Sequence, residues 1–133
     1  GNLYVAGTTN GNITLGQQTL NAIGGTDGVL VKVTPAKVIE WAQLIGGSGN
    51  DNCTGVSIDN TGNVMTTGIF SETVSFGNNA LTSRGGTDVY VAKMNANGNA
   101  QWVKQAGSTS DDNVESISHN GAGGAVITGS HGF

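Results

Sequence analysis

The 133-residue sequence is short of charge, aromatic side chains, proline and cysteine. Charged residues make up 11% of it and aromatic residues 5%, against about 25% charged residues in a typical soluble domain. The single cysteine excludes an internal disulfide framework and a cysteine-rich metal site. Five Lys and Arg against nine Asp and Glu give a net charge of −4, so no basic patch can form for nucleic acid or an anionic membrane surface. No apolar run reaches the roughly 18 residues that a membrane-spanning helix needs.

Small polar residues take the place of the missing charges. The chain has 23 Gly, 15 Asn, 15 Thr and 10 Ser, which together make up nearly half of it. These residues suit strands and tight turns and form helices poorly. Glycine and β-branched residues also interrupt every apolar period of 3.6, so no helix of ten or more residues is predicted. The composition therefore predicts an all-β fold.

An internal repeat of 61 residues organises the whole chain. Sliding the sequence against itself by 61 positions leaves no gap, and eighteen of the 72 aligned pairs are identical. The identities concentrate on turn residues and on the only two tryptophans. The residues of this repeat signature are Gly24, Gly25, Asp27, Trp41, Asp51, Gly85, Gly86, Asp88, Trp102 and Asp112. The repeat units predicted for this single domain are 1–61, 62–122 and an incomplete 123–133.

Each unit contains four predicted strands, which the second unit shows best. They are Thr54–Asp59, Asn63–Phe70, Asp88–Met94 and Ala100–Gln105. A long polar connection carrying one short strand-like piece, Thr73–Phe76, is expected between the second and third of them. Asn97-Gly98 predicts a two-residue hairpin, because both central positions of that turn need a positive φ.

Four antiparallel strands repeated at a fixed interval are typical of a β-propeller blade. A single blade cannot bury both of its faces, whereas radial stacking covers each face with the next blade. Trp41 and Trp102 lie at the same phase of the repeat, so they are expected to fill the gap between neighbouring blades. The alternative is that this pair forms a platform on which a ligand stacks.

The same residues resemble a known family, the bacterial seven-bladed β-propeller repeat, abbreviated SBBP. The pieces that carry the resemblance are Trp41, Gly46 to Asp51, Asp59, Gly62-Asn63-Val64, Thr67-Gly68, Asp88 to Lys93, and Asn95 to Trp102. Two departures concern turns: Pro35-Ala36-Lys37 replaces a glycine-containing hairpin, and His119 to Ala122 replaces an Asp-bearing turn. The resemblance implies a propeller on secreted or surface-attached bacterial proteins, some of them exported by type IX secretion. It implies no enzymatic activity and no cofactor.

The chain holds about two blades' worth of strands. The position in the repeat at which the sequence starts predicts the last three strands of one blade, a complete second blade and the first two strands of a third. A closed ring of seven such blades would need roughly 430 residues. The chain is therefore expected to be a fragment of a six- to eight-bladed propeller or one protomer of a ring, and not a self-sufficient monomer. Its predicted partners are the remainder of the same protein, sister chains, or a secretion or cell-surface protein.

Two sets of acidic residues are the first candidates for a functional site. Asp51, Asp111 and Asp112 lie in equivalent loops and could hold Ca²⁺ with neighbouring Asn and backbone oxygens. Their spacing matches no known calcium loop, and an Asp after Gly-Ser also accepts backbone hydrogen bonds within its own turn. Asp27 and Asp88 each precede a strand, and their repetition favours a turn-closing role over a unique site.

The remaining reactive residues form no recognisable set. Cys53 aligns with Val114 and is expected to be a buried, inert thiol. His119 and His131 fall in different turns without other ligands at metal-binding spacing. The prediction is therefore a non-catalytic binding, adhesion or scaffold module, secreted or on the cell surface. The alternatives are a carbohydrate-binding propeller, for which Trp41 and Trp102 are the candidates and a glycan the ligand, and a structural passenger of a larger protein.

Overall fold

The computed structural model describes residues 1–132, which form eleven strands and no helix, and hence no helix that could cross a membrane. The strands are β1 Leu3–Thr9, β2 Ile13–Leu15, β3 Gln18–Leu20, β4 Asp27–Val33, β5 Ile39–Ile45, β6 Gly55–Ile58, β7 Val64–Phe76, β8 Asn79–Met94, β9 Ala100–Ala106, β10 Asp112–His119 and β11 Ala125–His131. All pairs are antiparallel. The all-β prediction is confirmed.

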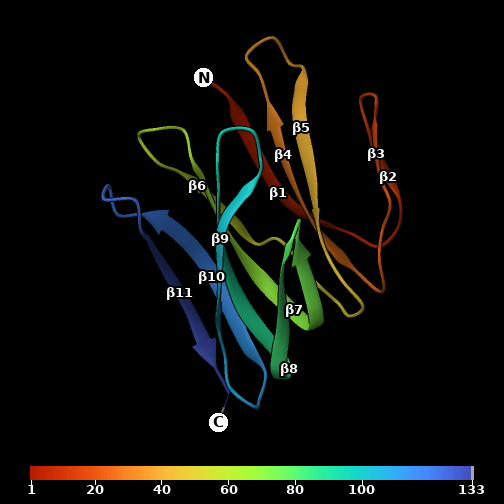
Figure 1. Cartoon of the computed structure of the whole chain (residues 1–133), viewed down its shortest axis with the longest axis vertical. Coiled ribbons are helices and arrows are strands. Elements are labelled where there is room, and N and C mark those ends of the chain that lie inside the picture. The colour runs from red at the N-terminus through yellow and green to blue at the C-terminus, as the bar shows by residue number, and fades with distance from the viewer. Residues whose placement is uncertain (133) are drawn as a thin grey trace.

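The strands form three sheets that follow one another through the molecule, with the small β2–β3 hairpin beside the first (Figure 1). The first sheet has the order β1-β4-β5, the second β6-β7-β8-β9, and the third β10-β11. These are the last three strands of one blade, a complete blade and the first two strands of another, as the repeat predicted. The sheets do not close into a ring, so the structure is a partial β-propeller.

The repeat also fixes the register of the outer strands. Trp41 of β5 lies opposite Lys32, and Trp102 of β9 lies opposite Lys93. A β-bulge follows the lysine in both sheets. The two tryptophans therefore occupy the same position in adjacent blades.

The expected polar connection between the second and third strands is wrong for the second blade. Strand β7 continues past Phe70 to Phe76, and β8 starts at Asn79, so the connection is an extended hairpin. A bulge interrupts the pairing near Glu72, whose φ is 57°. Beyond the bulge, Val74 and Phe76 are buried and hold the hairpin against the core. Because the residues at the bulge are polar, the sequence pattern did not indicate that the strand continues beyond it.

Most of the core lies between the first and second blades. Leu30, Trp41 and Ile45 of the first sheet pack in one cluster with Phe70, Val74 and Tyr90 of the second. A smaller cluster joins the β2–β3 hairpin to the outer part of the first sheet. Burial of apolar side chains across the junction thus joins the blades into one body.

Candidate functional site

Trp41 fills the junction between the first two blades. Its side chain is 8% exposed, and its Nε1 donates to the carbonyl oxygen of Ala96 in the β8–β9 turn, 2.9 Å away. Tyr4 packs edge-on against the ring, with 6.3 Å between centroids. Lys32 donates to the same Ala96 carbonyl at 3.2 Å and to Glu40 at 2.9 Å. Trp41 therefore joins blades, and its ring is covered by protein.

Trp102 occupies the same register but is only half-buried. The indole of Trp102 makes no hydrogen bond within residues 1–132. Of the two tryptophans proposed as binding residues, only Trp102 offers a surface to a ligand in this structure. A binding role for either residue stays a prediction.

The β8–β9 turn, which faces Trp41, contains a glycine that the equivalent turn of the first unit lacks. Substitutions at the two positions test what this departure from the repeat costs. Gly98 has a φ of 83°, and its counterpart Lys37 adopts a φ of 64°. A Cβ at Gly98 would lie 3.0 Å from the Trp41 ring. We expect Gly98→Ala to lower the free energy of unfolding by at least about 1 kcal/mol, and Lys37→Gly to raise it by about 0.5–1 kcal/mol. Urea denaturation of both variants checks this, and the same sign of change in both would contradict it.

Asp27 and Asp88 are fully buried at equivalent positions of the repeat. Asp27 begins β4, whereas Asp88 lies inside β8 and not before a strand as predicted, because β8 already starts at Asn79. Asp27 Oδ2 accepts from the backbone nitrogen of Ile23 at 2.6 Å, and Asp88 Oδ2 accepts from that of Arg84 at 3.2 Å. Gln105 also donates to Asp88. Asp27 thus closes the loop that precedes β4, and Asp88 makes the same i to i−4 contact within β8, where the pairing with β7 is irregular.

A glycine just after the end of the following outer strand, β5 or β9, lies against each of these carboxylates. A Cβ at Gly46 would overlap Asp27, and one at Gly107 would overlap Asp88. These close approaches explain why the repeat has glycine at both places.

The third pair of equivalent residues, Asn50 and Asp111, also serves the junction. The side-chain oxygen of Asn50 accepts from the backbone nitrogen of Thr26 at 3.2 Å. Asp111 does the same for Thr87 at 3.0 Å. Asp111 is therefore already used as a hydrogen-bond acceptor between one blade and the next.

Asp51 and Asp112 are buried, at 1% and 3% exposure. Asp112 Oδ2 accepts from the backbone nitrogen of Ser108 at 2.7 Å. Neither oxygen of Asp51 has a donor in ordinary hydrogen-bond geometry, although the backbone amides of Gly47 and Ser71 are close enough to lower its pKa. Burial dominates, with repulsion from Asp27 adding to it, and the pKa of Asp51 rises to about 7.

The structure separates the three calcium candidates by role. Asp111 and Asp112 accept backbone hydrogen bonds, and Asp51 is held by burial among backbone amides. Within residues 1–132, no three His, Cys, Asp or Glu side chains gather at a spacing that could hold a metal ion. Calcium binding at Asp51, Asp111 and Asp112 stays a prediction.

Cys53 is buried in the main hydrophobic cluster, beside a few polar groups. Its Sγ is 3.0 Å from Thr66 Oγ1, and Tyr90 donates its hydroxyl to the carbonyl of Asn52 at 2.7 Å. Burial raises the pKa of the Cys53 thiol, which disfavours the nucleophilic thiolate. His119 lies elsewhere, 3.0 Å from the hydroxyl of Ser57. Ser57 also accepts from the backbone nitrogen of His119 at 3.1 Å, so this Ser–His contact joins β6 of the second sheet to β10 of the third.

One groove, of about 550 Å³, lies between the β2–β3 hairpin and β5, and two others lie between blades. The first of these two, of about 450 Å³, runs between the second and third sheets and has mainly apolar walls that include Val89, Val114 and Ile127. The other, of about 270 Å³, lies between β5 and the β7–β8 hairpin and is lined by carboxamide side chains. Sequence reasoning missed this last groove. Its one sequence signal is the clustering of Asn at two predicted turns, Asn78-Asn79 and Asn97-Gly98-Asn99.

Comparison with known families agrees with this architecture. Residues 40–68 match the family model described as SBBP, beta-propeller repeat. The matched stretch runs from β5 through β6 into β7, so it spans the junction between two blades. No curated protein matches the chain.

Proposed function

We propose that this chain, which carries the SBBP-type β-propeller repeat, is a non-catalytic binding or adhesion module of a secreted or cell-surface bacterial protein. One observation carries the proposal: the residues that the repeat keeps constant are used to join strands and blades. Trp41, Asp27 and Asp88 all contact backbone groups of their own or the next blade. A scaffold built in this way leaves the variable hairpin tips free to contact a protein or a glycan.

The sheet edges support a role within a larger assembly. In the described part of the chain, β1 pairs only with β4, and β11 pairs only with β10. Leu3, Val5 and Val126 on these strands are 60%, 45% and 54% exposed. Open edges and exposed apolar side chains favour association with another polypeptide segment. The segment proposed is the remainder of the same protein, a sister chain, or a secretion or surface partner such as type IX export would require.

Two measurements test the proposal. Antibody labelling of intact cells of the encoding bacterium is expected to detect the protein outside the cytoplasm. Biolayer interferometry with the full chain is expected to show saturable binding to the purified cell envelope, with the bound material unchanged over hours. Labelling only after the cells are broken would contradict the proposed location. Steady release of a soluble product from the envelope would contradict the non-catalytic role.

A further inference from the structure

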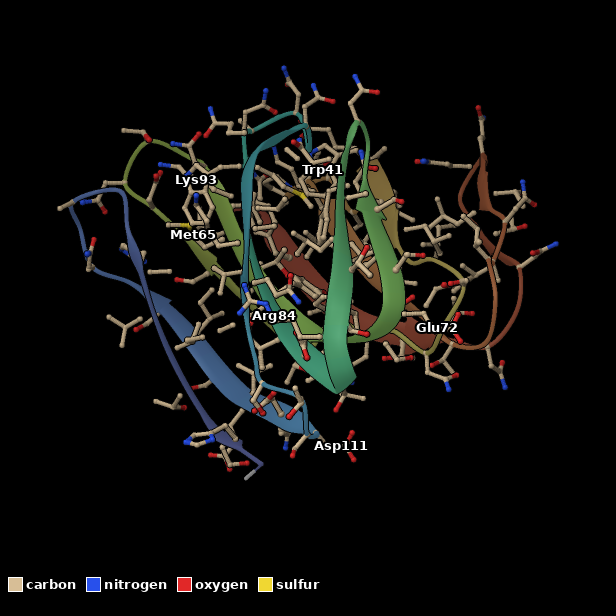
Figure 2. The ribbon with its side chains drawn as sticks, turned by 60° about the horizontal axis from the view of Figure 1, so that its bottom comes forward. Trp41, Met65, Glu72, Arg84, Lys93 and Asp111 are labelled. Atoms are coloured by element: carbon tan, nitrogen blue, oxygen red, sulfur yellow. The ribbon has the colours of Figure 1, made fainter. Side chains whose placement is uncertain are left out.

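The 270 Å³ groove has three walls from two different blades. The outer strand of the first blade supplies Gln43–Ile45, the tip of the β7–β8 hairpin supplies Phe76–Asn79, and the β8–β9 region supplies Met94 and 98–100. Figure 2 shows side chains tipped with nitrogen and oxygen projecting from these hairpin ends, on the side of the molecule where Trp41 is labelled. The groove therefore exists only when two blades are stacked.

Contacts on either side of the groove hold its walls in place. The hairpin crosses to the first blade, where the backbone nitrogen of Ser75 donates to the carbonyl of Gly46 at 3.1 Å. The β8–β9 turn is fixed by Trp41, whose Nε1 donates to Ala96. The groove is thus formed before any ligand arrives, which lowers the cost of binding.

The lining is polar but uncharged. Four carboxamide side chains reach the groove, and no Asp, Glu, Lys, Arg or His lines it; the four are Gln43, Asn78, Asn79 and Asn99. None of these carboxamides makes a hydrogen bond of its own within residues 1–132. Behind them, Ile45, Phe76 and Met94 form a buried apolar floor.

Of the two carboxamides at the tip of the equivalent hairpin in the preceding repeat, Gln17 makes no hydrogen bond within residues 1–132, whereas Gln18 is already bonded. There Gln18, the counterpart of Asn79, donates to the carbonyl of Ala42 at 2.9 Å and accepts from its backbone nitrogen at 3.2 Å. The longer glutamine side chain thus binds the open edge of β5 at the middle of the strand. In the second blade the hairpin reaches across to its neighbour instead, and its carboxamides stay available.

We propose that this groove binds one ring of a neutral sugar. A carboxamide both donates and accepts hydrogen bonds, which matches hydroxyl groups that do the same. The apolar floor suits the C–H face of a pyranose, and the volume lies just below the 300–1,000 Å³ range of pockets for drug-sized ligands. An ionised ligand would find no counter-charge in the groove. This inference rests on the proposed binding function and names its ligand class and place.

The test is NMR titration of the ¹⁵N-labelled full chain with glucose, galactose, mannose and N-acetylglucosamine. At least one of them is expected to shift the side-chain amide signals of Gln43, Asn78, Asn79 and Asn99, with a Kd of about 1–10 mM. Glucuronate and glucosamine, which are charged, are expected to bind at least about tenfold more weakly. Asn78→Ala is expected to raise the Kd about tenfold. Gln17→Ala, the same position in the preceding hairpin, is the matched control and leaves the Kd unchanged.

A tetrasaccharide of the sugar that binds shows whether the natural ligand is a polymer or a free sugar. A groove that recognises a polymer is expected to bind the tetrasaccharide more tightly than the monosaccharide, whereas a groove for a free sugar is not. Equilibrium dialysis with the same sugars replaces NMR if association broadens the signals. No binding of any neutral sugar overturns the inference, as does binding that Asn78→Ala leaves unchanged. The proposed binding function survives either result if the envelope still binds the chain, and fails only if that binding is also absent.

Discussion

Replacing Trp41 with alanine is expected to lower the free energy of unfolding by about 3–5 kcal/mol, the range for truncating a large buried aromatic side chain. Two losses combine at this position. The cavity left in the junction has Tyr4 and Gly98 as neighbours. The carbonyl of Ala96 loses its indole donor, although Lys32 still reaches it. Urea denaturation followed by far-UV circular dichroism measures the change without relying on tryptophan fluorescence.

Trp102→Ala is the matched control, since it removes the same residue from the same register of the next blade. Trp102 is half-buried and its indole has no hydrogen-bond partner in the described residues, so a smaller loss of about 1–2 kcal/mol is expected. A loss below about 1 kcal/mol for Trp41→Ala would show that Trp41 does not hold the blades together. Trp41→Phe separates the hydrogen bond from the packing, because it restores most of the volume.

The sequence was sufficient to predict the order of the nine blade strands and their grouping into blades, but not the β2–β3 hairpin or the extensions of β7 and β8. The 61-residue repeat placed Asp27 with Asp88 and Trp41 with Trp102, and the structure gives each pair equivalent partners on the neighbouring strand. A repeat predicts architecture well because equivalent residues make equivalent packing contacts in every blade. The repeat cannot predict a structural feature in which one copy differs from the other.

The groove proposed to bind a sugar is such a feature. Asn79 and Gln18 align in the repeat, yet the Asn79 carboxamide is free and that of Gln18 binds the edge of β5. The difference follows from the hairpin of the second blade, which pairs Ser75 with Gly46 of its neighbour. That contact joins residues of two blades across a polar bulge, and neither periodicity nor turn signals could reveal it.

The pKa of Asp51 leads to the second large expected effect, a fall in stability between about pH 4 and pH 7. Burial raises this pKa from 3.8 to about 7 in the folded state. In that interval the folded chain binds a proton that the unfolded chain has lost, so the free energy of unfolding decreases as the pH rises. At about 1.4 kcal/mol per pH unit, the fall across the interval is roughly 4 kcal/mol.

Asp59 affects the pH dependence of stability in the opposite direction and in a different pH range. Hydrogen bonds from Asn63 and Thr61 hold its pKa well below the usual value. The stability that Asp59 provides is therefore present above about pH 4 and is lost only as the pH falls further. Urea denaturation between pH 5 and pH 8 thus reports on Asp51 without interference from Asp59.

Asp51→Asn is expected to flatten the pH profile and to make the variant more stable than the natural chain at pH 8. The asparagine removes the charge that burial disfavours and keeps an oxygen that can face the backbone amides of Gly47 and Ser71. Glu115→Gln, which removes one negative charge from an exposed position, controls for net charge and should leave the slope as it is. If the slope of Asp51→Asn between pH 5 and pH 8 equals that of the natural chain, then Asp51 does not titrate in this range, and the pH dependence must come from another group.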